Sequence, residues 1–114
     1  MFVLQKESRW RWPVPFKVPG DDGAMAPKEI AATFRLVPEE RRRELGSSDE
    51  GLKQILREAV VELHDLLDVE ERPIPHSPDL VEAVLANPWI FSGLALAYRD
   101  ALTGVPVTRA ERGN

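Results

Sequence analysis

Residues 9–18 read Arg-Trp-Arg-Trp-Pro-Val-Pro-Phe-Lys-Val, and this stretch decides the fold. Its even-numbered positions are all apolar, while arginine, proline and lysine occupy the odd-numbered positions. An alternation of period two that is rich in aromatic and β-branched residues is typical of a strand with one covered face. The two prolines leave an alternative open, in which the stretch is an extended polyproline segment.

The residues that follow predict the second half of a hairpin. Pro19-Gly20-Asp21-Asp22-Gly23 has the composition of a turn. A weaker alternation comes after it, at Ile30, Ala32, Phe34 and Leu36. We therefore expect antiparallel strands at 9–18 and 28–36. Because Pro13 and Pro15 lack backbone donors on the same edge, that edge should face outward and the even-numbered residues should hydrogen-bond to the second strand.

The next part of the chain predicts two helices. Pro38 and Gly46 are typical of the start and end of a short helix over Glu39–Leu45. Ser47 and Glu50 then form a capping box in front of a longer apolar pattern. Spacings of three and four predict an amphipathic helix of about five turns that ends near Asp68. Its apolar residues are Leu52, Ile55, Leu56, Ala59, Val60, Leu63, Leu66 and Leu67.

Two further helices are expected toward the C-terminus. Ser77 followed by Pro78 is an N-cap with proline at the first helical position. Asn87-Pro88 either caps a new helix or kinks a continuous one, and the apolar run Trp89–Leu102 ends before Gly104. Residues 105–114 are expected to be a flexible tail. The fold class is therefore α+β and mostly α, a single domain over 1–104, with a hairpin at about 9–36 and about four helices in a small bundle at about 38–102.

Composition excludes several classes of protein. The chain has 114 residues, which suits one domain, and it carries a net charge of −4. It contains no cysteine, so disulfides and thiolate sites are excluded. No apolar run is long enough to span a bilayer, and the N-terminus does not follow a signal-peptide pattern. We expect a soluble intracellular protein with no membrane partner.

Residues that could carry chemistry are few. His64 could share a metal with Asp65 or Asp68, but a zinc site needs three or four suitably spaced ligands. No serine lies in a Gly-x-Ser-x-Gly setting, and no glycine-rich phosphate loop is present. We therefore expect no enzyme, no metal and no cofactor.

The basic residues do not favour nucleic-acid binding. Arg41-Arg42-Arg43 is flanked by glutamates, and the overall charge is acidic. Arg9 and Arg11 should project from the opposite face of the strand to the tryptophans, so they would not form one stacking platform. A small regulatory, nucleic-acid-associated protein remains an alternative.

The apolar residues point instead to a protein partner. A two-stranded hairpin is marginal alone, and the last helix is apolar around much of its circumference. Either the helices and the hairpin cover one another within one chain, or part of this surface is buried against another chain.

Five motifs, taken in order, suggest a family. They are Trp10-Arg11-Trp12-Pro13-Val14, Val18-Pro19-Gly20-Asp21-Asp22-Gly23, Phe34-Arg35-Leu36-Val37-Pro38, Pro73-Ile74-Pro75-His76-Ser77-Pro78 and Tyr98-Arg99-Asp100-Ala101-Leu102. In order, size and spacing the chain resembles the small tail assembly chaperones of long-tailed bacteriophages and of tail-derived prophages. It departs from that family at Leu63–Leu67, and the loop that follows these residues has no glycine.

The resemblance implies a non-enzymatic role in the cytoplasm of a bacterial host. Such proteins bind the long, helical tape measure protein, keep it soluble, help tail tube subunits polymerise around it, and are absent from the mature virion. They often self-associate. The expected partner-binding residues are aromatic and lie on two elements. On the hairpin we expect an anchor for the domain or for its self-association at Trp10, Trp12, Phe16 and Phe34. On the last helix we expect the better candidates for partner contact, Trp89, Phe91 and Tyr98. Core packing is the alternative for each of them, and a structural head–tail or tail completion protein is the alternative function.

Overall fold

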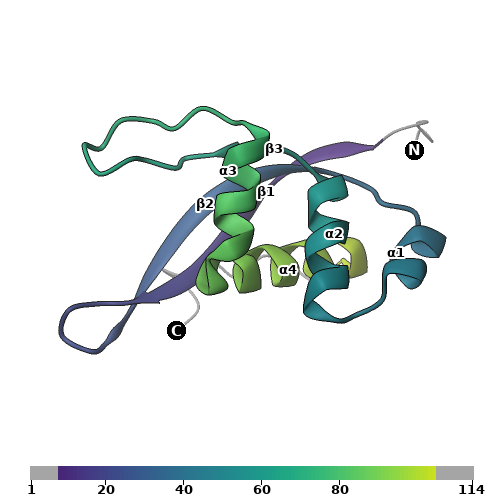
Figure 1. The fold of residues 1–114 in the computed structure, drawn as a ribbon, viewed down its shortest axis with the longest axis horizontal. Coiled ribbons are helices and arrows are strands. Elements are labelled where there is room, and N and C mark those ends of the chain that lie inside the picture. The colour runs from purple at the N-terminus through teal and green to yellow at the C-terminus, as the bar shows by residue number, and fades with distance from the viewer. Residues whose placement is uncertain (1–7, 105–114) are drawn as a thin grey trace.

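The fold is a three-stranded antiparallel sheet with four helices (Figure 1). A computed structural model describes residues 8–104, so the tail expected at 105–114 lies outside the described residues. The sheet order is β1-β2-β3, and the elements are β1 (Arg9–Pro19), β2 (Met25–Arg35), α1 (Glu39–Leu45), α2 (Asp49–Ala59), β3 (Val60–His64), α3 (Pro78–Ala86) and α4 (Pro88–Thr103). The predicted α+β class, the hairpin and the number of helices are confirmed. The third strand was not predicted.

The hairpin pairs along its whole length, which excludes the polyproline alternative. Trp10 lies opposite Phe34, and Val14 lies opposite Ile30. Just outside the two strands, the Leu36 N–H donates to the Ser8 carbonyl at 3.3 Å, which continues the pairing of even-numbered residues. The strand β1 lies at the edge of the sheet, as the prolines required.

The predicted helix of residues 52–67 is wrong in its second half. The helix α2 ends at Ala59, and the next five residues form β3 against β2. Val60 and Val61 are β-branched and favour a strand, and β2 offers its second edge to them. A bulge beside Thr33 and Phe34 places Val60 and Leu63 on the same buried face. Their separation of three residues therefore imitates helical spacing.

The helix caps follow local side-chain chemistry. The short helix α1 has the predicted bounds, with Pro38 as its N-cap residue. The cap of α2 is Ser48 rather than the predicted Ser47, because the Gly51 N–H donates to the Ser48 hydroxyl at 3.1 Å. Ser77 caps α3 as predicted, by accepting from the Leu80 N–H at 3.1 Å.

Asn87 begins a new helix, which resolves the alternative of a kinked one. Its side chain accepts from the N–H groups of Trp89 and Ile90 at 3.0 and 3.1 Å, and α3 and α4 meet at 103°. Gly104 ends α4 in the left-handed conformation that glycine adopts without strain.

The core lies between one face of the sheet and the helices. Val14, Ile30, Ala32 and Phe34 from the hairpin pack with buried residues of α2, α3 and α4. The α4 helix runs against β1, so the helices of the predicted small bundle form a layer on the sheet. The apolar face of the hairpin is thus covered within one chain.

Tyr98 joins this layer to the sheet. Its hydroxyl donates to the Arg35 carbonyl at 2.9 Å and accepts from the Val37 N–H at 2.8 Å. Its ring stacks on Trp10 with centroids 6.1 Å apart and contacts Phe34 with centroids 5.1 Å apart. Burial raises the pKa of Tyr98 above its ordinary value, so the hydroxyl keeps the proton that it donates.

We expect Tyr98→Phe to lower the free energy of unfolding by about 1–3 kcal/mol, because two backbone groups would lose their partner in a buried setting. The ring contacts would be kept, so the variant should remain folded. Urea unfolding followed by circular dichroism measures the change. Thr103→Val, which also removes a hydroxyl from α4 but at an exposed position, is the control. An unchanged Tyr98→Phe midpoint would contradict this role of the hydroxyl.

Candidate functional site

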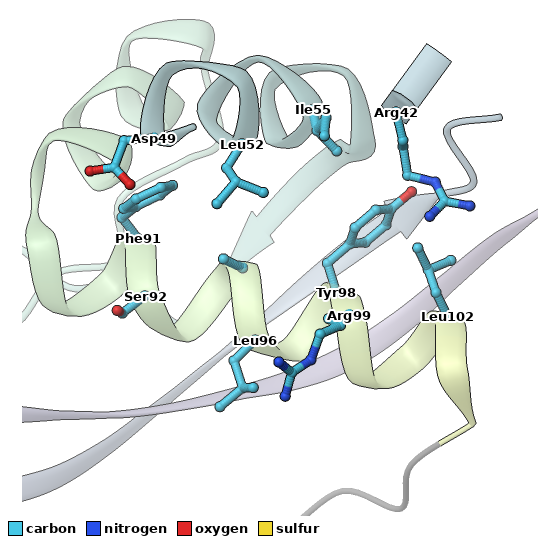
Figure 2. A pocket seen from close by; sticks show the side chains of 11 residues that line it. Arg42, Asp49, Leu52, Ile55, Phe91, Ser92, Leu96, Tyr98, Arg99 and Leu102 are labelled. Atoms are coloured by element: carbon cyan, nitrogen blue, oxygen red, sulfur yellow. The ribbon is translucent and has the colours of Figure 1, made fainter. Parts of the chain in front are cut away.

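An open apolar groove runs between α2 and α4 and ends at α1 (Figure 2). It has a volume of about 490 Å³. We call it the α2–α4 groove. Its lining residues are Arg42, Asp49, Leu52, Ile55, Phe91, Ser92, Ala95, Leu96, Tyr98, Arg99 and Leu102.

Helical spacing explains its apolar walls. Phe91, Ala95, Tyr98 and Leu102 follow one another at intervals of four, three and four residues, so they form one stripe along α4. Leu52 and Ile55 face them from α2 (Figure 2). Tyr98 is buried, whereas Phe91, Leu52 and Leu102 are half-exposed. The groove therefore offers apolar side chains that the fold has not covered.

The rim of the groove is mainly basic. Arg42 lies at the α1 end, where its Nε donates to the Val37 carbonyl at 3.0 Å, and Arg99 lines the groove from α4. At the other end the Lys53 ammonium lies 5.4 Å from the centroid of the Phe91 ring. Asp49 is the acidic lining residue. A partner with acidic groups beside an apolar surface would match this rim.

The apolar surface continues along the outside of α4. Trp89 is 39% exposed and Leu96, seven residues later on the same helix face, is 48% exposed. Beyond Leu96 a second hollow of about 170 Å³ lies between α4 and β1. Gly93 permits the close approach of α4 to β1 beside this hollow, since a Cβ there would lie 3.0 Å from the Pro15 carbonyl oxygen.

A third hollow lies where β1 begins. It has a volume of about 600 Å³ and is lined by Trp10, Trp12 and Leu36, among others. Leu36 is 49% exposed, and the Trp10 Nε1 is buried without a hydrogen-bond acceptor among residues 8–104. The apolar features thus extend from the α2–α4 groove around α4 to the hairpin.

The structure separates the predicted contact residues into three groups. Phe34 and Tyr98 are 0% and 4% exposed, so both pack in the core, and Tyr98 in addition lines the floor of the groove. Phe91 lines the groove and Trp89 lies on the surface. The half-buried hairpin residues are Trp10, Trp12 and Phe16.

Sequence reasoning missed other residues of this surface. The sequence pattern places Leu52 in the core and does not single out Leu96, Arg42 or Arg99 as surface residues of this site. The separation of seven residues between Trp89 and Leu96 was the available signal for the outer face of α4.

Neither histidine takes part in a cluster suited to a metal. Within residues 8–104, no group of three or more histidine or carboxylate side chains could hold a metal ion. His64 Nε2 lies 2.8 Å from the Thr33 hydroxyl. His76 Nδ1 accepts from the Leu63 N–H at 3.1 Å and so binds a donor on the outer edge of β3. Both side chains therefore have structural roles.

The arginines of β1 lie on the uncovered face of the sheet. Strand pairing places Arg11 beside Thr33, opposite to the covered face that holds Trp10 and Trp12. An Arg11 Nη lies 3.5 Å from the Asp65 carboxylate. Arginines and tryptophans thus do not share one face.

Comparisons with protein-family models, curated proteins and solved structures give no match to this chain. Among residues 8–104, no single helix has the length and apolar composition needed to cross a membrane, although the bent pair α3 and α4 meets that test when taken together.

Glu58 holds α1 at the end of the groove. Its carboxylate receives Arg41 Nη2 at 2.8 Å and Gln54 Nε2 at 3.0 Å. These hydrogen bonds, that of Arg41 above all, lower the pKa of Glu58 to about 2. The carboxylate side chain is 30% exposed, so solvent screening limits the stability gained.

The lowered pKa predicts a loss of stability in acid. Because the folded pKa of Glu58 lies below its unfolded value, the stabilisation is complete above about pH 5 and is lost as the pH falls toward about 2. Glu58→Gln should cost about 1 kcal/mol or less at pH 7 and progressively less at lower pH. Urea unfolding at pH 7 and pH 3 measures this, with Glu40→Gln on exposed α1 as the control. An equal cost at both pH values would contradict it.

Proposed function

We propose that this chain is a tail assembly chaperone of a long-tailed bacteriophage or prophage. In this role it binds the tape measure protein, keeps it soluble in the bacterial cytoplasm, promotes assembly of the tail tube and leaves before the virion is complete. The order of the five sequence motifs supports this assignment, and the α2–α4 groove is the observation that carries it.

The groove suits a helical client. An amphipathic helix binds by placing one apolar stripe in a groove between other helices. The partly exposed Leu52, Phe91 and Leu102 provide such a groove, and Trp89 and Leu96 extend its apolar surface along α4. Each contact of this size binds the client weakly, so tail tube subunits could displace the chaperone from the tape measure protein.

Co-expression with the tape measure protein of the same genome tests the proposal. The wild-type chain should raise the soluble fraction of the client and co-purify with it. Leu96→Asp should fold normally, because Leu96 is 48% exposed, and should weaken client binding about tenfold or more by placing a charge on the apolar surface. Trp89→Ala should weaken binding in the same direction.

Met25→Asp is the matched control. Met25 is an apolar residue that is 51% exposed on the hairpin, so its replacement should leave client binding unchanged. Client binding that is unaltered in both α4 variants would remove the groove from the proposal. Recovery of the chain in purified particles by mass spectrometry would favour a head–tail or tail completion protein instead. Steeply salt-dependent DNA binding would favour the nucleic-acid alternative.

A further inference from the structure

The segment between β3 and α3 is the second unusual feature of the surface. It projects from the sheet, away from α1 and α2 (Figure 1). We call residues 65–72 the acidic loop, because they comprise Asp65, Asp68, Glu70 and Glu71 with one basic residue, Arg72. Val69 is 100% exposed near its tip, and Leu67 is 54% exposed.

This loop is held in one shape by its own hydrogen bonds. The Asp68 carboxylate accepts from the backbone N–H groups of Glu70 and Arg72 at 2.8 and 3.0 Å, and the Asp68 N–H donates to the Arg72 carbonyl at 2.9 Å. The Arg72 guanidinium contacts Asp68 at 3.2 Å and Glu70 at 2.7 Å. At the base, the Ile74 N–H donates to the Leu66 carbonyl at 2.8 Å.

Glu71 completes the turn with φ +62°, a left-handed conformation that is uncommon for a residue other than glycine. Single exposed apolar side chains are ordinary on protein surfaces. Here two of them stand on one ordered projection. A loop that is already ordered loses little conformational entropy when it binds, so it is suited to present Val69 to a partner.

The α2–α4 groove is complementary to this loop in both polarity and charge. Its rim carries Arg42, Lys53 and Arg99 against the one acidic lining residue Asp49, and Arg99 is also 3.7 Å from Asp100. The loop carries four carboxylates and one arginine, so the net charges of the two surfaces are opposite. Its apolar interior of about 490 Å³ has room for a valine side chain. Within one chain the loop projects away from α2 (Figure 1), which forms one wall of the groove, so the pairing must join two chains.

We propose that the acidic loop of one copy inserts Val69 into the α2–α4 groove of a second copy. The inference rests on the proposed function in one respect, the use of this groove for binding. After one such contact, the first copy still has a free groove and the second copy still has a free loop, so the association is head-to-tail and gives rings or open chains. The contact is small and therefore weak, and a client helix would compete with the loop for the groove.

Sedimentation velocity over a concentration series tests the proposal. The wild-type chain should associate reversibly, and added salt should weaken the association by screening the charges. Val69→Asp should raise the dissociation constant about tenfold or more, and Met25→Asp should not change it. A wild-type chain that stays monomeric throughout, or a Val69→Asp variant that associates like the wild type, would overturn the proposal.

A mixing experiment tests the head-to-tail geometry. Val69→Asp keeps an intact groove but has an impaired loop, whereas Leu96→Asp keeps an intact loop but has an impaired groove. Each variant alone should therefore be monomeric. Their mixture should form a one-to-one dimer through the single intact pairing. Matching circular dichroism spectra and melting temperatures exclude unfolding as the cause. No complex in the mixture would overturn the proposal.

The two proposals fail in different ways. Val69→Asp should still keep the tape measure protein soluble, since its groove is intact, whereas Leu96→Asp should not. If Val69→Asp associates normally while Leu96→Asp loses the client, the loop assignment is wrong and the proposed function stands. If Val69→Asp is monomeric and the wild type does not bind the client, the loop assignment stands and the proposed function is wrong.

Discussion

The hydroxyl of Tyr98 is the interaction on which the rest of the arrangement depends. It binds one backbone carbonyl at the end of β2 and one backbone N–H just before α1. Those two groups flank Leu36, where the chain leaves the sheet and turns toward its helices. One side chain of α4 therefore fixes the direction of that exit as well as the position of the helix. The ring of the same residue forms part of the floor of the α2–α4 groove.

The groove is a consequence of this anchoring. Its walls come from α2 and α4, and its end comes from α1, so it exists only when helices distant in sequence are held in one layer. Glu58 supports the same arrangement from the other side, through its contacts with Arg41. The fold thus covers the hairpin completely enough to be stable while leaving Leu52, Phe91 and Leu102 half-exposed. This division explains how both sequence alternatives, packing within the chain and binding of another chain, can hold for different faces.

The parts of the fold that depend on neighbouring residues could be predicted from sequence. The hairpin, the proline edge and the Ser77 cap follow from alternation and from local hydrogen bonding. The third strand could not, because a bulge gives Val60 and Leu63 the spacing of a helix. The candidate site was predicted only in part: Phe91 and Tyr98 line the groove and Trp89 lies on the surface beside it, whereas Phe34 is buried in the core. A groove depends on how helices cross, and periodicity along one helix does not fix that angle.

The two edges of the sheet have a consequence for solubility at high concentration. The outer edge of β1 lacks donors at Pro13 and Pro15, and the outward N–H of Leu63 on β3 is occupied by His76. Neither edge presents a full row of free backbone groups, so the addition of another strand is disfavoured at both edges. Amyloid-like stacking of copies is thereby disfavoured.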